Sequence, residues 1–265
     1  MSCNLSETDL AIIASKLQRP YKSEPSLADL NSTLFPTLFA RSVAQYPNKL
    51  VFIDDTGSHT YTELELHTNA IANRLIQGGV KAGDSIGICC EQGRELLVGI
   101  YGILKAGCAY VPIDPDFPAE RVLSMIEDAG VQIVLVESTT DIKCQRILAC
   151  GINLSNVFVI NETATGPEAN IATPVLSRPV NHLDPFCCIF TSGSTGRPKG
   201  IFLNHGQLRY EMEGYNRYIS TVPEDQILLS SAVVFDMSLP ALYGTIQYGA
   251  TVFVASREGN VYPTA

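Results

Sequence analysis

The residues best suited to chemistry lie in one short stretch, Phe190–Gly200, which reads FTSGSTGRPKG. Seven of the ten residues from Thr191 to Gly200 are Gly, Ser or Thr, and Lys199 adds a positive charge. The backbone N–H groups of such a loop, together with its hydroxyl groups, can surround a polyanion. The apolar runs Phe186–Phe190 and Ile201–Leu203 predict strands on either side of the loop. We therefore interpret the stretch as a binding loop, most plausibly for a nucleotide triphosphate.

The loop matches neither of two common phosphate-binding sequences, because it contains no G-x-x-x-x-G-K-[ST] and no G-x-G-x-x-G. A solvated Gly/Ser linker is the alternative interpretation. Linkers are not usually placed between two apolar strands, which favours the phosphate loop. Arg197 is interpreted as an exposed loop charge.

Asp236 is the second residue that could carry chemistry. It follows the apolar run Ile227–Val234, which predicts a strand, and an unpaired carboxylate beside a buried strand is costly. Such a carboxylate could bind a cationic group of a ligand. It could also cap the helix predicted over Leu239–Gln247. Both interpretations are compatible with the residue type.

The elements that must position these residues predict an α/β fold. Short apolar strands alternate with helices, a pattern typical of mostly parallel sheets flanked by helices. The predicted strands are Ile86–Cys90, Ala109–Ile113, Val131–Val136 and Asn156–Ile160, with helices over Arg94–Lys105 and Pro118–Ala129. Ligands of such sheets bind at the carboxyl ends of the strands, and the loop follows a strand in this way.

The start of the chain predicts an N-terminal arm over residues 1–30 and one domain over residues 31–265. A helix is expected from Leu34 to Pro47, followed by a hairpin. Thr62 and Glu65 predict a capping box for the next helix, which ends at Gln77.

After the loop, Asn204 is expected to cap a helix with Leu208, Met212, Tyr215 and Ile219 on one apolar stripe. Residues Ala250–Ala255 predict a strand. Because the chain stops at Ala265, we expect this strand to lack its later neighbours and to expose an apolar edge.

Composition excludes several classes of protein. With 265 residues, a net charge of −9 and a pI of about 4.9, the chain is not expected to bind nucleic acid or an anionic membrane. The eight Cys include two adjacent pairs in apolar runs, which suits reduced core thiols better than disulfides or zinc. The N-terminus does not resemble a signal peptide, and the apolar run Leu96–Leu104 is too short to span a bilayer. We expect a cytoplasmic protein without a metal site of its own.

The loop resembles the signature motif of the adenylate-forming (AMP-binding) superfamily. Three further segments are similar to motifs of nonribosomal peptide synthetase adenylation domains, in the order of that family. They are TYTEL at Thr60–Leu64, LKAGCAYVPID at Leu104–Asp114 and FDMS at Phe235–Ser238. The resemblance covers the chain from about Leu34 onward and implies the N-terminal part of such a domain.

The resemblance implies roles for individual residues. The loop residues Thr191, Ser192, Gly193, Ser194, Thr195, Gly196 and Lys199 would bind the phosphates of ATP. Asp236 would pair with the α-ammonium group of an amino acid, with Phe235 beside the carboxylate. Met237 and Pro240 fall where the family's side-chain pocket begins, and His205 matches a His often found after the loop. His205 could equally cap the following helix.

The family's later motifs do not occur before Ala265. These motifs carry the adenine contacts, the magnesium ligand and the catalytic Lys, so we expect no catalytic residue and no magnesium ligand within the chain. The expected reaction is formation of an aminoacyl-AMP from an amino acid and ATP, followed by transfer to the phosphopantetheine thiol of a carrier-protein domain. The alternatives are an acyl- or aryl-acid CoA ligase, a carboxylic-acid reductase, or a non-catalytic truncated remnant.

Overall fold

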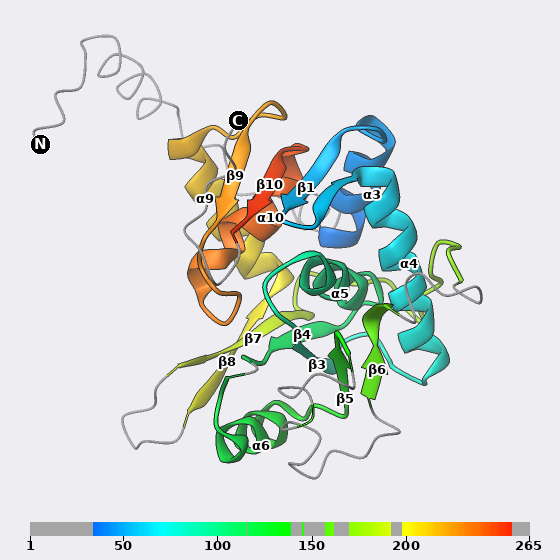
Figure 1. Ribbon diagram of the computed structural model, residues 1–265, viewed down its shortest axis with the longest axis vertical. Helices are drawn as coiled ribbons and strands as arrows, with labels where there is room; N and C mark the ends of the chain where they lie inside the picture. The colour runs from blue at the N-terminus through cyan, green and yellow to red at the C-terminus, as the bar shows by residue number, and fades with distance from the viewer. Residues whose placement is uncertain are drawn as a thin grey trace, which may run out of the picture.

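The computed structural model of the protein describes residues 34–114, 116–138, 145, 157–161, 170–191 and 198–255 (Figure 1). The described strands form two sheets. The six-stranded sheet contains β3 (Ser85–Cys89), β4 (Ala109–Pro112), β5 (Ile133–Val136), β6 (Val157–Val159), β7 (Pro185–Thr191) and β8 (Lys199–Asn204). The four-stranded sheet contains β1 (Leu50–Asp54), β2 (Gly57–Thr60), β9 (Gln226–Leu229) and β10 (Thr251–Val254).

Both sheets are mostly parallel, as predicted. The strand orders are β6-β5-β3-β4-β7-β8 and β2-β1-β10-β9. Two pairs are antiparallel: the β1–β2 hairpin and the β7–β8 hairpin that carries the glycine-rich loop. All other strand pairs in the described residues are parallel. The α/β class is therefore confirmed.

Helices fill the space between the two sheets and cover the outer face of the larger one (Figure 1). The described helices are α3 (Phe35–Gln45), α4 (Tyr61–Gln77), α5 (Arg94–Lys105), α6 (Ala119–Ala129), α9 (His205–Ile219) and α10 (Leu239–Tyr248). One apolar core joins α3, α5 and α10 to strands of both sheets. A second core places α6 against the opposite face of β3, β4 and β7. The six-stranded sheet is thus covered on both faces, as its apolar strands require.

The predicted capping box is wrong by two residues. Thr60 accepts a bond from the backbone N–H of Glu63, and the Glu63 carboxylate accepts from the Thr60 N–H, so α4 begins at Tyr61. Glu65 instead pairs with Lys105, with Nζ and Oε1 3.7 Å apart. Burial lowers the pKa of Lys105 to about 8, although Glu65 partly offsets this.

Two strand predictions near the end of the chain also need correction. Strand β9 stops at Leu229 rather than at Val234, because residues 230–235 turn toward the next helix. Strand β10 is not an edge, since it pairs with β1 on one side and with β9 on the other. The edge strands of the smaller sheet are β2 and β9, and on β9 Leu228 is 45% exposed.

Helix α9 buries only half of its predicted apolar stripe. Asn204 caps it as expected, in a box with Gln207. Leu208 and Met212 are buried, whereas Tyr215 and Ile219 are 48% and 50% exposed. The second half of the helix therefore extends beyond the described core.

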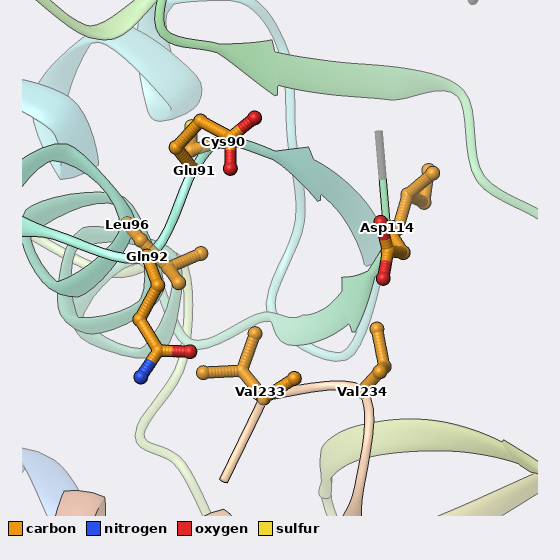
Figure 2. A pocket seen from close by; sticks show the side chains of 9 residues that line it. Cys90, Glu91, Gln92, Leu96, Asp114, Val233 and Val234 are labelled. Atoms are coloured by element: carbon orange, nitrogen blue, oxygen red, sulfur yellow. The ribbon is translucent and has the colours of Figure 1, made fainter. Parts of the chain in front are cut away.

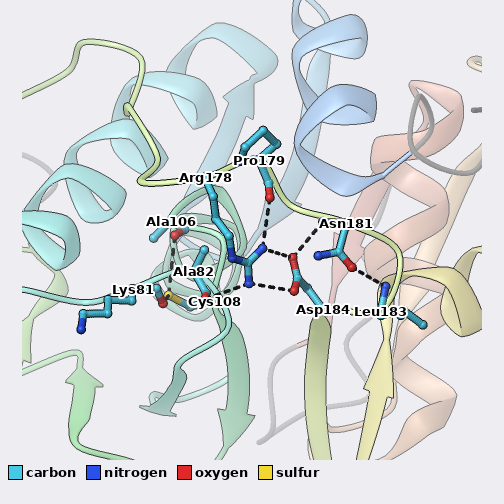
Figure 3. A network of polar contacts seen from close by, with 9 residues as sticks. All are labelled: Lys81, Ala82, Ala106, Cys108, Arg178, Pro179, Asn181, Leu183 and Asp184. Carbon is cyan, nitrogen blue, oxygen red and sulfur yellow. Dashed lines mark hydrogen bonds and ion pairs between the residues drawn. The ribbon is translucent and has the colours of Figure 1, made fainter.

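The segment from residue 170 to residue 184, here called the strap, crosses the starts of β3, β4 and β7. The Arg178 guanidinium forms two bonds with Asp184, of 2.6 and 2.8 Å, and donates to the carbonyl of Ala82, just before β3 (Figure 3). From α4, Asn73 donates to the carbonyls of Asn170 and Ala172. Hydrogen bonds thus tie this surface connection to the start of the sheet.

Candidate functional site

A cavity opens where two neighbouring parallel strands separate. Strands β4 and β7 share one register pair, Tyr110 with Cys187. Pro112, which has no N–H to donate, ends β4. Beyond this point a cavity of about 490 Å³ lies between the carboxyl ends of the two strands. This is the end of a parallel sheet at which ligands bind.

The cavity is mostly apolar and carries a few polar groups, which is the usual composition of a small-molecule site. Its walls come from β4, β7, β8, α6 and the segment before α10. The lining residues are Pro112, Phe117, Arg121, Met125, Ile189, Phe190, Thr191, Ile201, Leu203, Val234, Phe235 and Asp236.

The base of the glycine-rich loop lies at this cavity. Thr191 ends β7 and pairs in register with Lys199, the first residue of β8. Both residues are exposed, and Thr191 lines the cavity. Ser192, Gly193, Ser194, Thr195, Gly196 and Arg197 lie outside the described residues. The antiparallel pair therefore fixes both ends of the loop beside the cavity.

Gly200 explains why the hairpin needs glycine directly after Lys199. A Cβ atom at this position would lie 2.8 Å from Sγ of Cys188 and 3.0 Å from the Phe190 ring. Phe190 is itself a wall of the cavity. A side chain at Gly200 would push this wall aside.

Asp236 reaches the cavity from the other sheet. After β9, the chain makes a turn closed by the bond from the Phe235 N–H to the Ala232 carbonyl, 3.0 Å long. Residues Asp236–Ser238 then form a 3₁₀ turn that leads into α10, and the N-terminus of that helix shows no side-chain cap. The capping interpretation of Asp236 is therefore not supported, and Asp236 is one of the residues that line the cavity.

A second, smaller cavity lies behind this turn and shows how the two sheets are joined there. It measures about 30 Å³ and lies between the residues that follow β3 and β4 and the segment Ala232–Val234 (Figure 2). That volume has room for one or two water molecules. On one side, the Gln92 amide donates to the Leu229 carbonyl over 2.9 Å. This bond links the end of β9 to the end of β3, so it positions the segment that carries Asp236.

His205 does not belong to the cavity. It is 1% exposed, its ring meets that of Phe186 edge-on at 5.1 Å, and Asn204 rather than His205 provides the helix cap. Neither ring nitrogen has a hydrogen-bond partner among the described residues. Burial lowers the pKa of His205 to about 4, against a smaller opposing effect of Asp184. His205 is therefore a neutral core residue in this structure.

The structure brings together only part of the predicted site. Thr191, Phe235 and Asp236 line one cavity, whereas Met237 and Pro240 are not among its lining residues. Met237 is 73% exposed. The residues that sequence reasoning missed are those of α6, above all Arg121. The four-residue spacing of Phe117 and Arg121 was the signal, because residues four apart can meet on one face of a helical turn.

The described residues give no sign of a metal centre or of a membrane span. Within them, no group of three or more His, Cys, Asp or Glu side chains could hold an ion. No described helix is long and apolar enough to cross a bilayer. The five described cysteines, at positions 89, 90, 108, 187 and 188, form no disulfide in the described residues, and all five are buried in the core.

The sequence matches one family model and is similar to several peptide and antimetabolite synthetases. A family model described as "AMP-binding enzyme" matches residues 39–264. The chain is 34% identical over 232 residues to the AMB antimetabolite synthetase AmbB of Pseudomonas aeruginosa, covering 87% of this chain and 18% of that protein. It is 32% identical over 224 residues to gramicidin S synthase 2 of Brevibacillus brevis, covering 83% of this chain and 5% of that protein.

Solved structures agree with these sequence matches. The nonribosomal peptide synthetase FmoA3 matches with a TM-score of 0.75 at 27% identity, over 98% of this chain and 25% of its own. VinN matches with the same TM-score at 26% identity, over 84% of this chain and 59% of its own. FmoA3 has been solved with α-methyl-L-serine-AMP, and VinN with 3-methylaspartate. The chain thus spans less than two thirds of each of these proteins.

Proposed function

Because the chain belongs to the AMP-binding enzyme family, we propose that it forms the ATP- and amino-acid-binding part of an adenylation domain of the peptide-synthetase type. The observation that carries this proposal is the meeting of Thr191 and Asp236 at one cavity. Thr191 begins the hydroxyl-rich loop, and Asp236 supplies a carboxylate from a segment on the other sheet. One end suits phosphate oxygens and the other suits an ammonium group.

In the proposed reaction, a carboxylate oxygen of the amino acid attacks the α-phosphorus of ATP. A new acyl–phosphate bond forms, the bond between the α-phosphorus and its bridging oxygen to the β-phosphate breaks, and pyrophosphate leaves. Asp236 holds the α-ammonium group, which orients the carboxylate bonded to the same carbon atom. The loop donors and Lys199 hold the β- and γ-phosphates, which keeps the leaving group in place.

Magnesium would neutralise phosphate charge in this reaction, but the described residues offer no assembled site for it. We therefore assign no step of the chain's chemistry to a metal ligand within them. Transfer of the acyl group to a phosphopantetheine thiol belongs to the same proposal, with a carrier-protein domain as the partner. The proposed location is the cytoplasm.

The proposal is tested by ligand binding to the 265-residue chain. Isothermal titration calorimetry with MgATP and with each common amino acid should show binding of the nucleotide and of a small set of amino acids. Lys199→Ala should weaken MgATP binding about tenfold, through loss of a charge-assisted phosphate contact. Asp236→Asn should weaken amino-acid binding by a similar factor, since Asp236 is exposed in the described structure.

One result would favour the acyl- or aryl-acid ligase instead. If the deaminated analogue of the preferred amino acid binds as tightly as the amino acid itself, Asp236 does not pair with an ammonium group. The amino-acid assignment would then fail, while MgATP binding at the loop would stand.

A further inference from the structure

Arg121 is a charged residue at the cavity that the proposed chemistry leaves without a role. It lies near the start of α6 and lines the same cavity as Thr191 and Asp236. Its guanidinium carbon lies 3.9 Å from the centroid of the Phe117 ring. Stacking of this kind holds a guanidinium group in a fixed position against an aromatic wall.

The guanidinium group lacks an acceptor in the described part of the chain. Its Nε is buried and has no hydrogen-bond partner, and Arg121 forms no ion pair with a described residue. An N–H group removed from water without an acceptor destabilises the folded protein. A ligand oxygen placed in the cavity would provide the missing acceptor.

The other walls of the cavity make this charge informative. Met125, Ile189, Ile201 and Leu203 offer no polar side-chain group, so Arg121 and Asp236 are its two charged side chains. They have opposite signs. In a mostly apolar cavity, a few such groups determine which ligand binds and in which orientation. Such a cavity is complementary to a ligand that carries a cation and an oxyanion.

We infer that Arg121 binds an oxyanion of the ligand, either a carboxylate or a phosphate oxygen, and thereby acts as a specificity residue of the cavity. The planar fork of arginine matches both groups through two parallel N–H bonds. The inference rests on the proposed function, because it assigns a second contact to the same ligands.

The test uses calorimetry on the full 265-residue chain, with Arg121→Gln and Arg121→Lys beside the wild type. The probes are MgATP, inorganic pyrophosphate, the amino acid that binds best, and its amino alcohol, which lacks the carboxylate. Arg121→Gln should weaken binding of the contacted ligand about tenfold to a hundredfold. The affinity of Arg121→Lys should lie between those of the wild type and Arg121→Gln, because lysine keeps the positive charge but lacks the planar guanidinium group.

The pattern of losses identifies the oxyanion. Weaker binding of MgATP and pyrophosphate, with unchanged amino-acid binding, assigns Arg121 to a phosphate. Weaker binding of the amino acid, with equal binding of the amino alcohol by wild type and variant, assigns it to the carboxylate.

Arg74 provides a matched control. It also lies over a phenylalanine, 5.1 Å from the Phe158 ring centroid, but it does not line the cavity. Arg74→Gln should leave every affinity unchanged.

If the wild type binds MgATP and Arg121→Gln binds all four probes as tightly as the wild type does, the inference is overturned and the proposed function stands. If the wild type binds neither MgATP nor any amino acid, both fail. Circular dichroism checks that each variant is folded, and Arg121→Lys keeps the test valid should Arg121→Gln not fold.

Discussion

The two ends of the six-stranded sheet differ in how their polar groups are satisfied. At the strapped end, where β3, β4 and β7 begin, the Asp184 carboxylate accepts bonds from Arg178 and from the Asn181 N–H. At the open end, where the same strands finish, Phe235 is 60% exposed, Asp236 is exposed, and Arg121 has a buried N–H group without a described acceptor.

This difference separates stability from binding. Burial and paired polar groups at the strapped end favour the folded state, whereas we propose that the unpaired groups at the open end contact a ligand. Binding sites commonly carry such unsatisfied groups at a cost in stability. Substitutions at the strapped end should therefore change the free energy of unfolding, and substitutions at the open end should change affinity. The following predictions test this comparison, from the largest expected change in stability to the smallest.

Acid should destabilise the protein through His205. Its pKa of about 4 in the folded state is below the ordinary value of 6.5, because burial disfavours the charged form. The unfolded chain therefore takes up the proton at higher pH, and stability falls as the pH drops from about 6.5 toward 4. The loss should reach about 3 kcal/mol at pH 4. Urea denaturation at several pH values measures it.

His205→Leu should flatten this pH dependence, whereas the control His182→Asn should keep it. An unchanged slope in His205→Leu would show that other groups cause the acid sensitivity.

The Arg178–Asp184 ion pair should contribute almost as much to the free energy of unfolding as the neutral state of His205 does. Asp184→Ala removes three bonds and leaves the Asn181 N–H without its acceptor, so the free energy of unfolding should fall by about 2–3 kcal/mol. Burial alone would raise the pKa of the Asp184 carboxyl. The bonds from Arg178 and from the Asn181 N–H outweigh this effect, so the pKa is lowered overall. Its contribution should therefore be present above about pH 4 and be lost in stronger acid. Arg178→Ala should cost less, because Arg178 is more exposed than Asp184.

The strap also offers a test within one helix. Asn73 donates to two strap carbonyls, at 2.9 and 2.7 Å, whereas Asn69 donates to one at 2.9 Å and keeps a buried oxygen without a described partner. Asn73→Ala should cost about 1–2 kcal/mol and Asn69→Ala about 1 kcal/mol or less. Hydrogen exchange should show faster opening of residues 170–172 in Asn73→Ala. Equal losses of stability in the two variants would mean that the number of hydrogen bonds to the strap does not determine the loss.

The sequence predicted the elements with strong local signals and missed what depends on distant contacts. Helix α5 was predicted with both of its ends, and the strands on either side of the loop were found, because apolar periodicity and glycine are local features. The place of β10 inside its sheet was missed, since its neighbour β1 comes from a distant part of the chain, whereas β9 is the strand directly before it.

The residues of the site also differ in whether local sequence signals reveal them. The loop and Asp236 were predicted from motifs. Arg121 was missed because it reaches the cavity only after α6 packs across the larger sheet. Nothing in its immediate neighbours shows that β4 and β7 separate beside it.

The smallest expected change in stability belongs to Phe235, at the open end. A phenylalanine that is 60% exposed loses little burial when truncated, so Phe235→Ala should change the free energy of unfolding by about 0.5 kcal/mol or less. Its ring nevertheless forms a wall of the cavity beside Asp236. The same substitution should weaken amino-acid binding about tenfold, since a ligand that covers the ring gains apolar burial.

The control is Tyr218→Ala on α9, another aromatic residue, 66% exposed and away from the cavity, which should change neither quantity. Urea denaturation and calorimetry on the same samples measure both effects. A loss of stability above about 1.5 kcal/mol in Phe235→Ala, with unchanged affinity, would show that Phe235 supports the fold. The distinction between the two ends would then not hold at this residue.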